Sequence, residues 1–218
     1  MRLKALLLSL MLSLMLALAA GPLAAAPLRI LAFGDSLTEG YGLKRGQGLV
    51  PQLQAWLRAR GHDVIVLNGG LSGDTTAGGR VRIGYSLARH RPDAVIVELG
   101  GNDLLMGFGP AMVEDNLDSI LSQAGQNGRP LLLVGIALPQ KDAPLREEWA
   151  GIWPRLGARH DALVLENLYQ PLYDGPDEQY LSLLQEDQLH ASAKGVGLIV
   201  EALGPKVEEL IARTEARR

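Results

Sequence analysis

The 218-residue chain contains no cysteine, which removes several kinds of structure and chemistry at once. It cannot form disulfide bonds, which an exported domain of this length does not require. Lipid attachment at a cysteine is also excluded. With four scattered histidines and no thiolate ligand, we expect no zinc site.

Aromatic residues are few as well, and the chain has no excess of basic residues. Aromatic residues make up 5% of the chain, and the formal net charge is −3, with no basic stripe. A surface that binds nucleic acid concentrates lysine and arginine, so we expect no nucleic-acid partner. The chain also lacks G-x-x-x-x-G-K-[ST], and it lacks G-x-G-x-x-G after its first predicted strand. Both absences argue against nucleotide binding.

The first 26 residues have the composition of a secretory signal peptide. A basic start at 1–4 precedes a leucine-rich apolar run at 5–20, and small residues follow. A transmembrane anchor is the alternative, but the run is shorter than the roughly 20 residues that a span needs. We expect cleavage to leave one domain, 27–218, that is periplasmic or secreted, without a stable membrane anchor. Pro27 leaves the exact cleavage site open.

Short apolar runs alternate with helical patterns in the remaining chain. The predicted strands are 28–33, 63–68, 94–99, 131–136 and 162–166. The predicted helices are 48–60, 75–90, 110–126, 144–159 and a last one capped by Ser192. Pro154 and Pro205 are expected to kink or break their helices, and 167–189 is expected to be irregular. The alternation predicts an α/β domain with a parallel sheet between two helical layers.

The segment GDSLTEG at 34–40 places Ser36 directly after the first predicted strand. Open parallel sheets gather their chemistry beyond the carboxyl ends of the strands. A serine hydroxyl is a weak nucleophile unless a base lies within hydrogen-bond reach. Ser36 is therefore a predicted nucleophile if the same edge supplies a histidine, an acid and donors for an oxyanion.

One of the four histidines is expected at that edge. His190 follows the fifth strand and directly precedes the last helix, so it can face Ser36. Asp187, three residues earlier, can accept a bond from Nδ1–H and leave Nε2 toward the serine. Taken alone, this spacing also fits a solvated turn. The other three histidines end predicted helices at the opposite edge, where we expect ordinary surface roles: His62, His90 and His160.

Two further loops that follow strands supply candidate oxyanion donors. Gly73 lies after the second strand, and Asn102 lies in GGND after the third. Glycine lets the backbone approach a ligand closely. The N–H groups of Ser36 and Gly73 and the Asn102 amide are therefore a candidate oxyanion hole, with simple turns as the alternative. Neighbouring carboxylates are expected to brace the loops by accepting backbone N–H bonds: Asp35, Asp74 and Asp103.

These four segments together resemble the SGNH hydrolases, also called GDSL esterases and lipases. LSGDT at 71–75 and VELGGND at 97–103 are most similar to bacterial exported thioesterases, arylesterases and lysophospholipases. The resemblance implies a three-layer, flavodoxin-like fold, a five-stranded parallel sheet of order 2-1-3-4-5, and no metal or cofactor. The family often has glycine after the aspartate and proline after the histidine. Gln188 and Ala191 stand there, which implies a less rigid loop.

The residues after Asn102 indicate the substrate. The segment LLMGFG at 104–109 is apolar, so four side chains are candidate substrate-binding residues, with packing under the next helix as the alternative: Leu104, Leu105, Met106 and Phe108. We expect a monomeric serine hydrolase that cleaves small-molecule acyl esters or thioesters of medium or long chain through an acyl-enzyme. A carbohydrate or cell-wall O-acetylesterase is the alternative, and a non-catalytic periplasmic binding domain is a remote one. The absence of G-x-S-x-G argues against an α/β-hydrolase.

Overall fold

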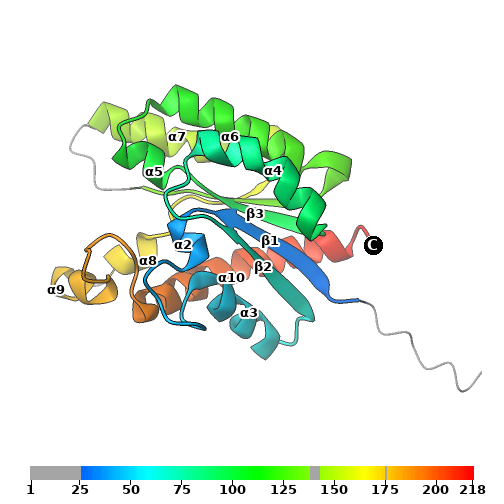
Figure 1. Ribbon diagram of the computed structural model, residues 1–218, viewed down its shortest axis with the longest axis horizontal. Coiled ribbons are helices and arrows are strands. Elements are labelled where there is room, and N and C mark those ends of the chain that lie inside the picture. The colour runs from blue at the N-terminus through cyan, green and yellow to red at the C-terminus, as the bar shows by residue number, and fades with distance from the viewer. Residues whose placement is uncertain (1–25, 138–142, 175) are drawn as a thin grey trace, which may run out of the picture.

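The computed structural model describes residues 26–137, 143–174 and 176–218. A five-stranded sheet lies between two groups of helices (Figure 1). Every strand pair is parallel, and the order is β2-β1-β3-β4-β5, which confirms the predicted α/β fold and strand order. The strands are β1 (Leu28–Gly34), β2 (Val64–Gly70), β3 (Ala94–Glu98), β4 (Leu131–Val134) and β5 (Leu163–Leu165).

Helices α4, α6 and α7 cover one face of the sheet, and α3 and α10 cover the other (Figure 1). These helices are α3 (Leu49–Ala59), α4 (Thr76–His90), α6 (Pro110–Ala124), α7 (Ala143–His160) and α10 (Ala193–Glu215). Shorter helical segments are α2 (Ser36–Glu39), α5 (Gly101–Leu105), η1 (Gln126–Gly128), α8 (Gln170–Tyr173), α9 (Asp177–Tyr180) and η2 (Leu181–Leu183). The last three lie within 167–189, so the prediction of an irregular stretch there is wrong. Buried Leu172 and Leu183 pack these turns against the core.

The side chains of β1 alternate between the two helical layers. Ile30 and Ala32 pack on the side of α3 and α10, whereas Leu31 and Phe33 pack on the side of α4, α6 and α7. This period of two is that of any strand, and a parallel sheet covered on both faces is apolar throughout. The strands therefore form a rigid frame whose carboxyl ends reach the surface together.

Neither internal proline divides its helix. Helix α7 continues through Pro154 and α10 continues through Pro205, so a break at these positions is not observed. Both prolines are exposed, whereas their neighbours Trp153 and Leu203 are buried. The backbone bond that proline removes therefore lies on a solvent-facing side, and core packing on either side keeps the helix continuous.

The expected signal peptide at 1–26 lies outside the described residues except for its last position, and it stays a prediction. Among the helices of the described ranges, none is both long and apolar enough to cross a membrane.

Gly204 sets how closely α10 approaches α3. A Cβ atom at this position would lie 2.5 to 2.7 Å from three ring carbons of Trp56. That ring is buried, and the guanidinium carbon of Arg60 lies over it, 3.5 Å from the ring centroid. The ring is thus held in place, and the absence of a side chain at Gly204 is a packing requirement.

Gly204→Ala should lower the free energy of unfolding by about 1–3 kcal/mol, because overpacking outweighs a gain in helix propensity of about 1 kcal/mol. Urea unfolding measures this change. Gly197→Ala in the same helix is the matched control, because a Cβ there meets its nearest atom at 3.5 Å. It should be neutral or stabilising. Equal effects of the two changes would contradict the packing role of Gly204.

Candidate active site

A cavity of about 310 Å³ lies at the carboxyl edge of the sheet. Its walls come from segments that follow different strands and from the segment before α10. The five residues predicted as nucleophile, base, acid and oxyanion donors line it together: Ser36, Gly73, Asn102, Asp187 and His190.

A continuous hydrogen-bonded relay runs from Asp187 through His190 to Ser36. His190 Nε2 lies 2.9 Å from Ser36 Oγ, although the two residues are 154 positions apart. His190 Nδ1 lies 2.6 Å from Asp187 Oδ2. The other Asp187 oxygen accepts the backbone N–H groups of Leu189 and His190, each at 3.0 Å. The carboxylate thus fixes both the loop and the imidazole.

The electrostatics of Asp187 favour an ionised carboxylate. Burial raises its pKa, but the bonds from the His190 ring and from the two backbone N–H groups outweigh burial, so the pKa is lowered. An ionised Asp187 accepts a hydrogen bond from a protonated Nδ1 of His190. That arrangement selects the tautomer in which Nε2 is free to accept the Ser36 hydroxyl proton.

Ser36 begins the short helix α2, and Asp35 caps it. Asp35 Oδ1 accepts the Leu37 N–H at 3.0 Å. Burial raises the pKa of Asp35 to about 6, although the Leu37 N–H and His190 act in the opposite direction. The cap fixes the turn that presents Ser36 at the end of β1.

Gly73 lies in the loop after β2 with a φ of +79°, a left-handed conformation that favours glycine. A Cβ atom here would meet nothing within 4 Å, and among the described residues its N–H has no protein acceptor. The preceding residue is tied down, because the backbone N–H and the hydroxyl of Ser72 both donate to the Glu39 carboxylate. Gly73 thus presents a bare N–H on an anchored loop.

Asn102 lies in the cavity wall, but its amide already has protein acceptors. Nδ2 donates to the Asp74 carbonyl at 2.8 Å and to Asp35 Oδ2 at 3.2 Å. A side-chain amide carries two hydrogens, so a new acceptor must replace one of these partners. The bond to the Asp35 carboxylate is the longer of the two.

The model of the GDSL-like Lipase/Acylhydrolase family matches residues 32–198. The chain belongs to this family. It is 33% identical over 188 residues to the esterase TesA of Pseudomonas aeruginosa, covering 86% of this chain and 91% of that protein. It is 30% identical over 189 residues to the Escherichia coli K12 thioesterase 1/protease 1/lysophospholipase L1, covering 86% and 87%. The crystal structure of AlinE4, an SGNH-hydrolase family esterase, superimposes with a TM-score of 0.69 and 39% identity, covering 84% and 96%.

The predicted resemblance to SGNH hydrolases is therefore confirmed, and the protein is a serine ester hydrolase by family and fold. Its relay, its Gly73 loop and Asn102 occupy the four sequence segments on which the resemblance was based.

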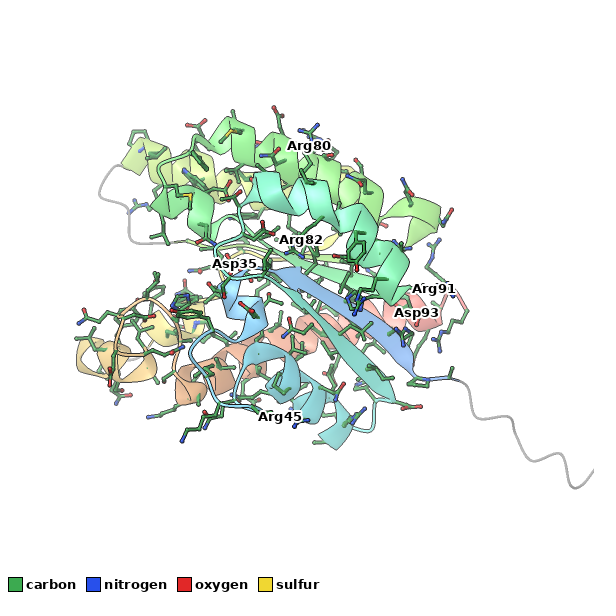
Figure 2. The ribbon with its side chains drawn as sticks, viewed as in Figure 1. Asp35, Arg45, Arg80, Arg82, Arg91 and Asp93 are labelled. Atoms are coloured by element: carbon green, nitrogen blue, oxygen red, sulfur yellow. The ribbon has the colours of Figure 1, made fainter. Side chains whose placement is uncertain are left out.

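In this SGNH hydrolase, Arg82 connects the loops that flank the cavity. Figure 2 shows Arg82 extending from α4 over the sheet, close to Asp35. Its guanidinium donates to the carbonyls of Gly34 and Gly69 at 2.7 and 2.8 Å, and it pairs with Asp74 at 2.6 Å. The fork therefore holds the ends of β1 and β2 and the residue after Gly73 in one arrangement.

The three predicted loop-bracing aspartates use different partners. Asp35 accepts a backbone N–H, as predicted, and Asp103 accepts both the N–H and the hydroxyl of Thr76, at 2.9 and 2.6 Å. Within the described part of the chain, the carboxylate of Asp74 pairs with Arg82 and accepts no backbone N–H, so the prediction of a backbone N–H partner is wrong for Asp74. A long side chain from the following helix supplied a stronger, charge-assisted bond.

Of the four candidate substrate-binding residues, Leu105 alone lines the cavity as described. Leu104 packs against the core on the side of α4, α6 and α7. Met106 and Phe108 are 57% and 38% exposed and lie outside the lining, because α5 ends at Leu105 and the chain then leaves the cavity. Other apolar walls come from single residues in separate segments: Leu37, Ile136 and Leu189.

The remaining histidines have partners away from the cavity. His62 lies 3.0 Å from Glu208, and His160 lies 2.9 Å from Asp118. Burial lowers the pKa of His90, whose carbonyl accepts Arg29. Over the described ranges, no cluster of three potential ligand side chains could hold a metal ion.

Proposed function

We propose that the protein hydrolyses acyl esters or thioesters of medium or long chain through an acyl-enzyme on Ser36. The relay of Asp187, His190 and Ser36 carries this proposal, since a binding domain has no need of such an arrangement. We also propose that the mature enzyme acts outside the cytoplasm. The composition of residues 1–26 supports export, and sequencing the N-terminus of the mature protein tests it.

In the first step, Ser36 Oγ attacks the acyl carbonyl carbon while His190 Nε2 takes its proton. Asp187 stabilises the imidazolium that forms. His190 then gives the proton to the leaving alkoxide or thiolate, which leaves an acyl group on Ser36. Water then attacks that acyl group while His190 takes its proton, and the bond from the acyl carbon to Ser36 Oγ breaks as His190 returns the proton to Oγ, which releases the acid.

The oxyanion of each tetrahedral intermediate would lie among the Ser36 N–H, the Gly73 N–H and the Asn102 amide. Asn102 donates to Asp35 at 3.2 Å, a bond long enough to be exchanged. A charged oxyanion is a far stronger acceptor than an uncharged carbonyl, so it is the species that can compete for this hydrogen. The amide would then stabilise the transition state more than the bound substrate.

The apolar walls of the cavity support an acyl substrate. Leu37, Leu105 and Leu189 line a space of about 310 Å³ beside the relay. Each buried methylene contributes up to about 0.8 kcal/mol, which an acetyl group could not exploit. The names of the relatives, esterase and thioesterase, point the same way.

Ser36→Ala and His190→Ala should each remove nearly all turnover, about 10⁴-fold or more, and combining them should add little, because the residues act as a unit. A fluorophosphonate label should be found by mass spectrometry on the Ser36 peptide. Ser72 also lies at the cavity, but its hydroxyl is bonded to Glu39. Ser72→Ala is therefore the matched control, and it should still be labelled on Ser36. Label on Ser72, or full activity in His190→Ala, would contradict the assignment.

Asn102→Ala should lower kcat by about 10²–10³ with little change in KM, because the amide acts on the oxyanion rather than on the substrate. Steady-state kinetics on a p-nitrophenyl ester measure both constants, and thermal unfolding reports the loss of the two bonds to Asp35 and Asp74. A variant with reduced stability and unchanged kcat would show that the amide serves only to hold the loops.

For the wild-type enzyme, kcat/KM should rise as the acyl chain lengthens from acetyl to about eight carbons, because added methylenes meet the apolar wall. Leu105→Ser should flatten that rise and leave acetyl ester hydrolysis largely unchanged. Met106→Ser is the matched control, since Met106 is adjacent but does not line the cavity. A wild-type preference for acetyl esters would favour the O-acetylesterase instead.

A further inference from the structure

The hydroxyl of Tyr169 bonds to the backbone on both sides of His190. It donates to the Leu189 carbonyl at 3.0 Å and accepts the Ala191 N–H at 3.1 Å. Tyr169 precedes α8, and 4% of its surface is exposed. A residue remote in sequence therefore holds the two peptide groups that flank the histidine of the relay.

Among the described residues, the Leu189 carbonyl and the Ala191 N–H have no hydrogen-bond partner other than Tyr169. The Gln185 N–H donates to the His190 carbonyl, and the Gln185 side chain donates to the Ala191 carbonyl. Neither contact involves the Leu189 carbonyl or the Ala191 N–H. If the tyrosine hydroxyl were removed, the Ala191 N–H would lose its partner. Because Ala191 is buried, water could not readily replace that partner.

The loop has a conformation that needs such support. Gln188 adopts a φ of +56°, which is unfavourable for a residue with a long side chain. Ala191 supplies a backbone N–H, which proline at that position would lack. The hydroxyl oxygen of Tyr169 accepts a hydrogen bond from this N–H. Burial raises the pKa of Tyr169, so the hydroxyl keeps its own proton and can donate it to the Leu189 carbonyl.

We propose that Tyr169 is a positioning residue that sets the imidazole of His190 against Ser36. This inference rests on the proposed function, because it acts through the relay. Tyr169 also lines the cavity, so a contact with the acyl chain is the competing role. The two roles differ in the constant they change: a displaced imidazole lowers kcat, whereas a lost acyl contact raises KM.

The test is Tyr169→Phe, which removes one oxygen and keeps the ring. Tyr173→Phe is the matched control, because Tyr173 is partly buried, its hydroxyl lies 3.5 Å from that of Tyr180, and among the described residues it makes no hydrogen bond to the His190 loop. Tyr169→Phe should lower kcat on p-nitrophenyl hexanoate by about 10- to 100-fold, the cost of a misplacement of up to about 1 Å. KM should stay within about twofold, the fluorophosphonate labelling rate should fall in parallel, and Tyr173→Phe should match the wild type.

A second arm places Tyr169→Phe in the His190→Ala background. If Tyr169 acts through the imidazole, the residual turnover should change by less than about twofold. An unchanged kcat in Tyr169→Phe, a loss confined to KM, or an equal loss in the His190→Ala background would each overturn the inference. With an active, labelled wild type, those results overturn the role of Tyr169 alone. A wild type that neither hydrolyses esters nor takes the label overturns the proposed function, and this inference with it.

Discussion

The site depends on the parallel pairing of β1 with β2 on one side and with β3 on the other. The register aligns Gly34 with both Gly70 and Glu98, so the three strands end at one level. The segments that follow them carry Ser36, Gly73 and Asn102. Since parallel strands deliver their carboxyl ends to one edge, residues far apart in sequence meet there without any local signal between them. The segment before α10 then brings His190 to the same edge.

Alignment of the strands does not by itself fix the loops. Side chains from the following helices do so: Arg82 joins the ends of β1 and β2, and Asp103 joins α5 to α4 through Thr76. Beneath them, burial raises the pKa of Glu98, which accepts the Thr38 hydroxyl at 2.8 Å. Removing one partner of a largely buried polar or charged pair, such as Arg82 and Asp74, leaves the other without its partner at a cost in stability, so the edge is held in a single arrangement. Candidate donors that are already in place, such as the N–H groups of Ser36 and Gly73, would need no reorganisation during a reaction.

The parts of the molecule that the sequence predicted are those with a strong period or a fixed place in the strand–helix alternation. The five strands and the meeting of Ser36 with His190 and Asp187 belong to this group, whereas the strand order was implied by the resemblance to SGNH hydrolases. The walls of the cavity do not belong to this group, because their apolar residues come from several separate segments and no single stretch of sequence contains the pattern. The turn after Leu105 likewise depends on where α5 ends, and this removed Met106 and Phe108 from the lining. Pro205 failed to break its helix because packing on both sides outweighs one lost bond.

The partners of Asn102 suggest why such a rigid edge can still discriminate between ground state and transition state. Its amide is held by the Asp74 carbonyl and, more loosely, by Asp35. A neutral substrate carbonyl is a poor competitor against a carboxylate, whereas an oxyanion carries the charge that makes the exchange favourable. In the proposed mechanism, the third donor would therefore engage only as negative charge develops on the carbonyl oxygen. An interaction that forms only at that stage lowers the barrier without tightening substrate binding, so the long bond from Asn102 to Asp35 would serve catalysis by being exchanged for the oxyanion but not for the neutral substrate carbonyl.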